Sequence, residues 1–340
     1  MNICDHFQLL YPVISCISFG TGHIHETFLV TCADGSRYTL QKVNAAVFPD
    51  IPLLMENVRK VTEHLQAKHA ENTLRLIPAQ DGASFVTDAD GAVWRMFSFV
   101  PGICRERAET PEEFAGAGRA FGTFLRDLSD LPAGTFPEVI PDFHHTPKRV
   151  KALEEAVRND RAGRAGLVRE ELAIALSRAE TYGQLIRLRD AGRLPVRLIH
   201  GDTKCSNIVL DERTGEPVCV LDLDTVMPGL AAWDVGEAVR SGANAAAEDE
   251  TDLSRVTFKM SFAEAFLRAY EETCADLLTD EEKRSLPSGV KTMTYENGIR
   301  FLTDYLNGDV YFKTAYPEHN LVRARCQFRL LAEEEACLRY

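Results

Sequence analysis

Acidic and amide side chains follow apolar runs near the middle of the 340-residue chain. Asp202 comes just after "RLIHG", Asn207 opens "NIVLD", and Asp222 ends "VCVLD". Burying carboxylates is costly unless a cation pairs with them, and Mg²⁺ takes a few such oxygen ligands when phosphates supply the rest. An aspartate that is free of the metal can accept the proton of an attacking hydroxyl. The spacing therefore permits phosphoryl transfer, although each piece alone could equally be a turn or a capped strand.

The three apolar runs are predicted to be short strands, with a hairpin at Glu212–Glu216 joining the last two. Adjacent antiparallel strands would bring Asp202, Asn207 and Asp222 to one edge of a small sheet.

Composition limits the class of partner. The chain is 45% hydrophobic and 26% charged, with a formal net charge of −13. This balance argues against a nucleic-acid partner, because such proteins carry a basic surface. The length favours two compact units that share a cleft.

Nine cysteines are scattered without a CxxC pair, which favours free thiols in a reducing cytosol. The N-terminal segment has no basic region before its apolar run and is broken by Pro12, so it is not typical of a signal peptide. No apolar run approaches the length of a membrane span. We expect a cytoplasmic protein with no membrane partner.

The first hundred residues predict strands around one helix. Two hairpins are expected at Ala33–Gly35 and Ala89–Gly91, with an amphipathic helix over 51–70 between them. A capping box from Thr110 to Glu113 then opens a helical region. Further helices are expected over 169–190, 232–241, 257–275, 279–284, 289–306 and 320–338. The fold class is therefore α+β, with a strand-rich lobe over 1–100 and a mostly helical lobe over 101–340, hinged at Pro101-Gly102.

The segments "HGDTKCSN" and "VLDLD" resemble the motif of the aminoglycoside phosphotransferase and choline kinase superfamily, the small-molecule relatives of protein kinases. More narrowly, "LQKVN", "WDVGEAVRS" and "RFLTDYLNGDVYFKTAYPEHNLVRARCQF" are similar to bacterial N-acetylhexosamine 1-kinases. The resemblance covers nearly the whole chain. It implies a bilobal protein-kinase-like fold, and it implies that the protein uses ATP and Mg²⁺.

The resemblance implies roles for the central residues. Asp202 would be the catalytic base, Lys204 would meet the γ-phosphate, and Asn207 and Asp222 would hold Mg²⁺. Asp224 is left open between a metal contact, a sugar contact and its own turn. Only ten residues separate Asp222 from the helix that begins near Trp233, which is too short for the activation segment of a protein kinase. The acceptor is therefore expected to be small.

The nucleotide contacts are expected in the first lobe. Gly20 and Gly22 would offer backbone amides to phosphate, although an ordinary hairpin turn would contain the same glycines. The position of the lysine of the third kinase strand falls on Gln41 or Lys42, depending on register.

The helix partner of that position would be Glu56 or Glu63. Phe99 would lie at the adenine hinge, where an ordinary strand between the lobes would look the same.

For the sugar, the resemblance favours Arg300 and Tyr311, and His25 is a further candidate. Asp234 and Arg240 are further candidates for sugar contacts, although a buried ion pair between them, behind the metal loop, is favoured.

The leading hypothesis is an ATP- and Mg²⁺-dependent kinase for the anomeric hydroxyl of N-acetylglucosamine or N-acetylgalactosamine. The first alternative keeps the chemistry and changes the acceptor to choline, ethanolamine, homoserine or an aminoglycoside. The second alternative is a nucleotide-binding pseudokinase scaffold. The sequence does not fix the sugar epimer or the oligomeric state.

Overall fold

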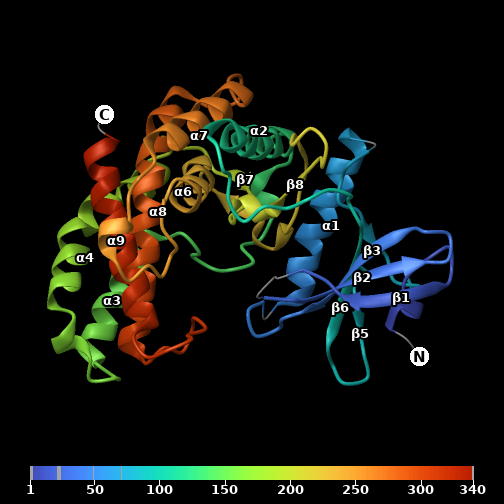
Figure 1. Cartoon of the computed structure of the whole chain (residues 1–340), viewed down its shortest axis with the longest axis horizontal. Helices are drawn as coiled ribbons and strands as arrows, with labels where there is room; N and C mark the ends of the chain where they lie inside the picture. Colours follow the sequence, from blue (N-terminus) through green and yellow to red (C-terminus); the bar gives the residue numbers. More distant parts are fainter. Residues whose placement is uncertain (1–2, 21–23, 49, 70, 339–340) are drawn as a thin grey trace.

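The computed structural model describes residues 3–20, 24–48, 50–69 and 71–338. Its N-terminal part is an antiparallel sheet in the order β1-β2-β3-β6-β4, with β5 added beside β6. Figure 1 shows this sheet at the right of the molecule, with the helical part at the left. The strands are β1 (Val13–Ser18), β2 (Glu26–Cys32), β3 (Arg37–Val43), β4 (Leu76–Ile77), β5 (Val86–Thr87) and β6 (Val93–Ser98).

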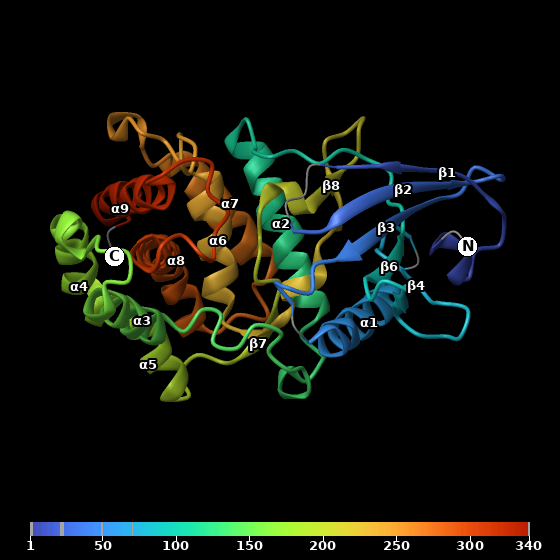
Figure 2. The ribbon, with the colours of Figure 1, turned by 90° about the horizontal axis from the view of Figure 1, so that it is seen from below.

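The single long helix of this part, α1 (Ile51–Lys68), covers one face of the sheet, as Figure 2 shows. Asp50 caps it by accepting from Leu53 N, and a proline follows at the first turn. Its buried stripe includes Leu54, Val58 and Val61, the apolar positions expected from the sequence. This stripe joins a core that also contains residues of the second part.

The second part is built mainly from helices, and its central layer consists of α2, α6, α7 and α8. The helices are α2 (Pro111–Asp127), α3 (Thr146–Asn159), α4 (Arg169–Tyr182), α5 (Gln184–Asp190), α6 (Ala231–Gly242), α7 (Met260–Thr273), α8 (Asp280–Asn307) and α9 (His319–Cys337). The predicted α+β class with a larger helical lobe is confirmed. The division of the chain into two lobes at residue 100 remains a proposal.

Two short ribbons lie between the sheet and the helices. β7 (Arg197–Ile199) pairs with β10 (Met227–Gly229), and β8 (Ile208–Leu210) pairs with β9 (Pro217–Val220). The three apolar runs were expected to form adjacent strands of one sheet. This is wrong for the first run, β7, because it pairs with β10 and not with β8 or β9. The β8–β9 hairpin is confirmed.

Three helical predictions need correction. The helix expected over 169–190 is interrupted at Gly183, which separates α4 from α5. The two helices expected over 279–284 and 289–306 are one helix, α8, with Pro287 inside it. The helix α3 was not predicted at all, although its Thr146-Pro147 start and its buried Val150 and Leu153 carry the usual signals.

The connection between the two parts passes Gly102. This glycine has φ +142°, and a Cβ atom there would collide with the backbone oxygen of Leu210. The next residue, Ile103, and Leu210 exchange two backbone hydrogen bonds, because the N–H of each donates to the oxygen of the other. The connection is therefore attached to β8. Within the described ranges, no helix combines the length and hydrophobicity needed to cross a membrane.

Candidate active site

The loop between β7 and β8 brings three of the predicted residues together. The Nδ2 of Asn207 donates to the backbone oxygen of Asp202 at 2.8 Å and to its Oδ2 at 3.2 Å. The Nζ of Lys204 lies 2.8 Å from Oδ1 of Asp202. Burial lowers the pKa of Lys204, but the carboxylates of Asp202 and Glu237 outweigh this effect and the pKa is raised. Lys204 therefore stays charged beside Asp202.

Asp234, near the start of α6, fixes the beginning of this loop. Its carboxylate accepts from the backbone N–H groups of His200 and Gly201, each at 2.8 Å. His200 is fully buried, and its Nδ1 accepts from the backbone N–H of Asp202. Its Nε2 therefore carries the hydrogen, which it donates to the backbone oxygen of Leu221 at 2.8 Å. The loop is thus attached both to α6 and to the strand end before Asp222.

The predicted ion pair between Asp234 and Arg240 is wrong. Arg240 is buried and pairs with Glu237 and Glu248, both of which come from its own helix or the segment after it. Asp234 instead satisfies backbone amides, because the tight turn at Gly201 leaves them without other acceptors.

Asp222 adopts the left-handed conformation, with φ 56°, at the start of a 3₁₀ turn. The preceding residue, Leu221, donates its backbone N–H to the oxygen of Asn207, so the two predicted metal ligands are neighbours. Burial, reinforced by the charges of Asp224 and Asp202, raises the pKa of Asp222 to about 7. A divalent cation would offset the repulsion among these carboxylates and favour the ionised form of Asp222.

Asp224 connects the second part of the molecule to the sheet. Arg95, on β6, donates to both of its carboxylate oxygens, and His25, beside β2, places Nε2 2.5 Å from Oδ2. All three side chains are at most 7% exposed. Burial alone would raise the pKa of Asp224, but Arg95 and His25 lower it well below its usual range. His25 accepts from the backbone N–H of Asn44 through Nδ1, which leaves Nε2 as the donor to Asp224.

The two candidates for the third-strand cation lie on opposite faces of the sheet. Gln41 accepts from Nε of Arg95 at 3.0 Å, so it faces α1 and Asp224. Lys42 lies on the other face, where it pairs with Glu26 and stacks on a tryptophan ring. Glu56, the predicted helix partner, pairs with Arg59 and another cation of its own helix. Its contacts therefore do not include Gln41 or Lys42.

The other nucleotide candidates are placed as follows. Gly20 has φ +81° in the turn between β1 and β2, and no atom lies within 4 Å of the position a Cβ would take. Gly22 lies outside the described residues. Phe99 donates its backbone N–H to the oxygen of Arg37 and packs against Phe19. Its N–H is thus used inside the sheet, which leaves only its carbonyl for a nucleotide base.

Arg300 and Tyr311 lie together in a separate group with aromatic neighbours. The guanidinium of Arg300 lies 5.4 Å from the ring centre of Phe143, 5.5 Å from that of Phe312 and 6.0 Å from that of Tyr311. The side chain of Arg300 makes no hydrogen bond or ion pair with any described residue, and its guanidinium contacts aromatic rings instead. Burial lowers the pKa of nearby Arg149, and the charge of Arg300 lowers it further.

The chemistry of the donors fits Mg²⁺ at Asn207 and Asp222. Across the part of the chain that the structure describes, the Oδ1 of Asn207 accepts no hydrogen bond and so has free lone pairs. No cluster of three or more histidine, cysteine or acidic side chains in that part could bind a metal ion alone. A metal ion here would complete its coordination with phosphate and water oxygens, as Mg²⁺ commonly does.

Sequence reasoning missed Arg95 and Arg149. The signal for Arg95 was a charged residue in the middle of the apolar strand "VWRMF", because a buried arginine needs an acidic partner. Arg149 gave no such signal, since it lies on a helix that was not predicted.

Comparison with known proteins identifies the class. Residues 15–284 match the model of the phosphotransferase enzyme family, APH. A microcompartment-associated aminopropanol kinase superposes with a TM-score of 0.68 at 19% identity, covering 98% of this chain and 95% of that one. An aminoglycoside phosphotransferase from Alicyclobacillus acidocaldarius gives 0.65 at 15% identity, with 99% and 93% covered. Amicoumacin kinase in complex with AMP-PNP, Ca²⁺ and its ligand gives 0.61 at 15%, with 94% and 89% covered.

The chain belongs to this phosphotransferase family, because the match spans most of its length. It is therefore a phosphotransferase. The superfamily predicted from the sequence is confirmed, whereas the narrower resemblance to N-acetylhexosamine 1-kinases has no counterpart among these matches.

Proposed function

We propose that this phosphotransferase uses ATP and Mg²⁺ to phosphorylate the anomeric hydroxyl of an N-acetylhexosamine. The observation that carries the choice of acceptor is the group around Arg300. Arg300 and Arg149 lie close enough to influence each other, and among the described residues Arg300 has no acidic partner. Two neighbouring cations disfavour a positively charged acceptor, whereas their N–H groups can donate to hydroxyl and acetamide oxygens.

Asp202 is proposed as the base. The acceptor hydroxyl attacks the γ-phosphorus of ATP, the bond from that phosphorus to the ADP oxygen breaks, and Asp202 accepts the hydroxyl proton. Lys204 and Asn207 orient the carboxylate of Asp202 through the contacts described above. Asn207 and Asp222 would hold Mg²⁺, which neutralises phosphate charge when bound.

The sheet side supplies support for the nucleotide. In this arrangement Gly20 offers its backbone N–H to the phosphates, and Gln41 faces the buried pair of Arg95 and Asp224. Arg95 takes the place of a third-strand lysine as the cation that the sheet directs toward the segment with Asp222 and Asp224. His25 and Asp224 are proposed to border the acceptor, with Tyr311 on its far side.

A second candidate keeps the reaction and changes the acceptor to an amino alcohol or an aminoglycoside. It is favoured by the structural relatives, which include an aminopropanol kinase and an aminoglycoside phosphotransferase. The net charge of −13 is compatible with a cationic acceptor. The arginines near Phe143 are the feature that speaks against it.

The test is ADP release from Mg²⁺-ATP with N-acetylglucosamine, N-acetylgalactosamine, glucose, choline, 1-amino-2-propanol and kanamycin. Turnover on the N-acetylated sugars supports the proposal if it is lost in both Asp202→Asn and Arg300→Ala. Asp211, in the hairpin between β8 and β9, provides the matched control, because Asp211→Asn makes the same change outside the site and is expected to keep full activity. Turnover only on the amino alcohols or kanamycin would establish the second candidate.

A further inference from the structure

The middle of α1 is attached to the second part of the molecule through Asn57. In Figures 1 and 2 this helix lies between the sheet and the helical part. Asn57 is 1% exposed, and its Nδ2 donates to the backbone oxygen of Pro137 at 3.0 Å and to that of Val226 at 3.1 Å. Glu56, the helix residue that the sequence favours for the site, pairs within its own helix, and the contact with the segment after Asp222 is made by its neighbour.

The orientation of the Asn57 amide follows from its partners. Both partners are carbonyl oxygens, which only accept, so the NH₂ group and not the oxygen must face them. The other amide atom, Oδ1, is buried and has no partner among the described residues. Burying an unmet acceptor is costly, and an apolar residue of the same shape would avoid that cost. The two donated hydrogen bonds are therefore what an amide adds at this position.

Val226 closes the turn that follows the proposed metal ligand Asp222. The 3₁₀ turn Leu223–Thr225 begins directly after Asp222, and the N–H of Val226 donates to the oxygen of Leu223 at 3.2 Å. Val226 thus holds the turn through its N–H group and accepts from Asn57 through its oxygen. A shift of Val226 would consequently move the turn and the carboxylate that precedes it.

The residue after Val226 connects the same contact to the catalytic loop. Met227 begins β10 and lies opposite Ile199 of β7. Ile199 comes three residues before Asp202 in the chain. The point that α1 holds therefore leads in one direction to the metal turn and in the other to the strand beside the catalytic loop.

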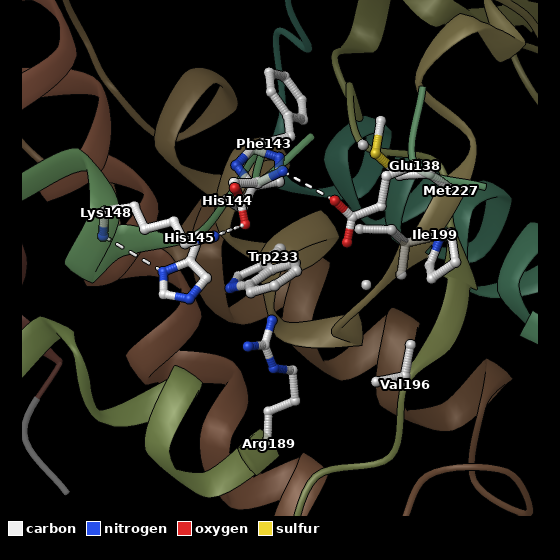
Figure 3. Close-up of a pocket in the computed structure, with 14 residues that line it drawn as sticks. Glu138, Phe143, His144, His145, Lys148, Arg189, Val196, Ile199, Met227 and Trp233 are labelled. Carbon is white, nitrogen blue, oxygen red and sulfur yellow. Dashed lines mark hydrogen bonds and ion pairs between the residues drawn. The ribbon is translucent and has the colours of Figure 1, made fainter. Parts of the chain in front are cut away.

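The two carbonyl groups that Asn57 binds come from neighbouring segments. Glu138 follows Pro137 and Met227 follows Val226, and Figure 3 shows Glu138 beside Met227 in the lining of one cavity. The side chain of Asn57 therefore joins three segments, which are α1, the chain between α2 and α3, and the start of β10.

The end of α1 is fixed to the second part of the molecule as well. The Nζ of Lys68 lies 2.8 Å from Oδ1 of Asp130, and Nε2 of His69 lies 2.6 Å from Oδ2 of Asp127, both at the end of α2. These contacts restrict sliding of the helix along its axis. Asn57 is thus a donor with a defined position relative to the metal turn.

We propose that Asn57 is a positioning residue for the metal site. Its two donated hydrogen bonds set the position of the turn that presents Asp222, and through it the affinity for Mg²⁺ bound together with a nucleotide. Arg95 holds the same turn from the sheet through Asp224, so Asn57 supplies a second, independent attachment. The role rests on the proposed function, in which Asp222 holds Mg²⁺.

Calorimetric titration with AMP-PNP, once with Mg²⁺ and once with EDTA, tests this role without turnover. The ratio of the two Kd values measures how much the metal contributes to nucleotide binding. Asn57→Leu keeps the branched shape of the side chain and removes both donors. We expect this ratio to fall by about tenfold or more, as for other groups that orient a metal ligand, with little change in the Kd measured in EDTA.

Thr62→Val is the matched control, because Thr62 lies on the same helix and is also 1% exposed. Its hydroxyl donates only to the oxygens of Val58 and Arg59 in its own helix, so its loss is expected to leave the ratio unchanged. Asn57→Ser replaces the leucine variant if the latter does not fold. A serine keeps one donor, and a fall in the ratio of about threefold or more is expected.

The outcomes separate this role from the proposed function. A ratio in the Asn57 variants equal to that in Thr62→Val would overturn the proposal, even if their unfolding temperatures fall. Equal weakening of binding with Mg²⁺ and with EDTA would overturn it too, because the metal would not be involved. If Mg²⁺ does not strengthen AMP-PNP binding by the unsubstituted protein, the proposed metal site itself is wrong, and the role of Asn57 is refuted with it.

Discussion

Arg95 of β6 donates to both carboxylate oxygens of Asp224, so a buried ion pair joins the N-terminal sheet to the segment that carries the predicted metal ligand Asp222. The two side chains are 2% and 3% exposed. Gln41 and His25 satisfy further donors and acceptors of the pair. This connection constrains the distance between the sheet and the catalytic loop.

Removing one partner of this pair is expected to destabilise the protein strongly. Arg95→Ala leaves Asp224 buried with only His25 beside it, and such losses cost about 3–5 kcal/mol. The free energy of unfolding, measured in urea, checks this. Arg59→Ala is the control, because its pair with Glu56 is exposed and worth about 0–1 kcal/mol. Equal losses in the free energy of unfolding for the two substitutions would show that the buried pair contributes no more to stability than an exposed one.

The pKa of Asp222 predicts how stability depends on pH. It rises from 3.8 to about 7 on folding, so the folded state binds the extra proton between these values. The contribution of this group is therefore fully present below pH 3.8 and is lost as pH rises through about 7. In metal-free protein, Asp222→Asn is expected to raise the unfolding free energy by on the order of 2 kcal/mol at about pH 8 and to change it little at about pH 4.

Metal binding should show the opposite dependence on pH. A metal ion needs the ionised carboxylate, so Mg²⁺ competes with the proton on Asp222 below about pH 7. Calorimetric titration is expected to show weaker Mg²⁺ binding at about pH 6 than at about pH 8, with proton release that depends on the buffer. Affinity that does not vary with pH would argue against Asp222 as a ligand.

Asp234→Asn tests the anchoring of the catalytic loop. An amide can accept from only one of the two backbone N–H groups that Asp234 satisfies, and its own NH₂ would face the other. We expect kcat to fall by about tenfold or more, because positioning of Asp202 is lost. The control is Asp211→Asn, since Asp211 also accepts from two backbone amides but lies in the hairpin between β8 and β9, away from the catalytic loop. Similar kcat values for both variants would contradict this role.

Gly102→Ala should loosen the connection between the two parts. The new Cβ collides with the backbone of Leu210, and φ at this position is one that side chains rarely adopt. A loss of about 2 kcal/mol or more is expected in the free energy of unfolding. Gly134→Ala, where no atom lies within 4 Å of the new Cβ, is expected to change stability by less than about 1 kcal/mol. Thermal unfolding of the two variants distinguishes these outcomes.

Local signals predicted much of the fold. Thr279 opens α8 with the capping box expected from "TDEE", and both hairpins of the sheet form where the Asp-Gly pairs lie. Thr110 caps α2 by accepting from the backbone N–H of Glu113. The capping box is incomplete, because the carboxylate of Glu113 accepts from the backbone N–H of Glu109 and not from that of Thr110. These features depend on neighbours a few residues apart, and the sequence displays them directly.

Long-range packing accounts for what the sequence did not predict. Pro287 would ordinarily interrupt a helix, yet α8 continues through it because the following turn packs closely on α6. Gly289 lies so near the backbone of Ala232 that a Cβ would not fit. The pairing of β7 with β10 and the contact between Arg95 and Asp224 likewise join segments that are remote in the chain.

The candidate site divides in the same way. The grouping of Asp202, Asn207 and Asp222 follows from motif spacing, and the structure places the β7–β8 loop, which holds the first two, beside the end of β9, which Asp222 follows. The choice between Gln41 and Lys42 depended on which face of β3 meets α1, and sequence alternation alone left that open. Of the aromatic neighbours of Arg300, Tyr311 and Phe312 follow it in the same segment, whereas Phe143 is remote in the chain, so no local pattern could reveal its part.

The short stretch between Asp222 and α6 has a consequence for control of the enzyme. Residues 223–229 are fully used by a 3₁₀ turn and by β10, and the hydroxyl of Thr225 is already engaged with the oxygen of His200. This stretch thus has no spare length for a covalently modified on–off element of the kind that gates protein kinases. Activity should therefore not depend on covalent modification of residues 223–229.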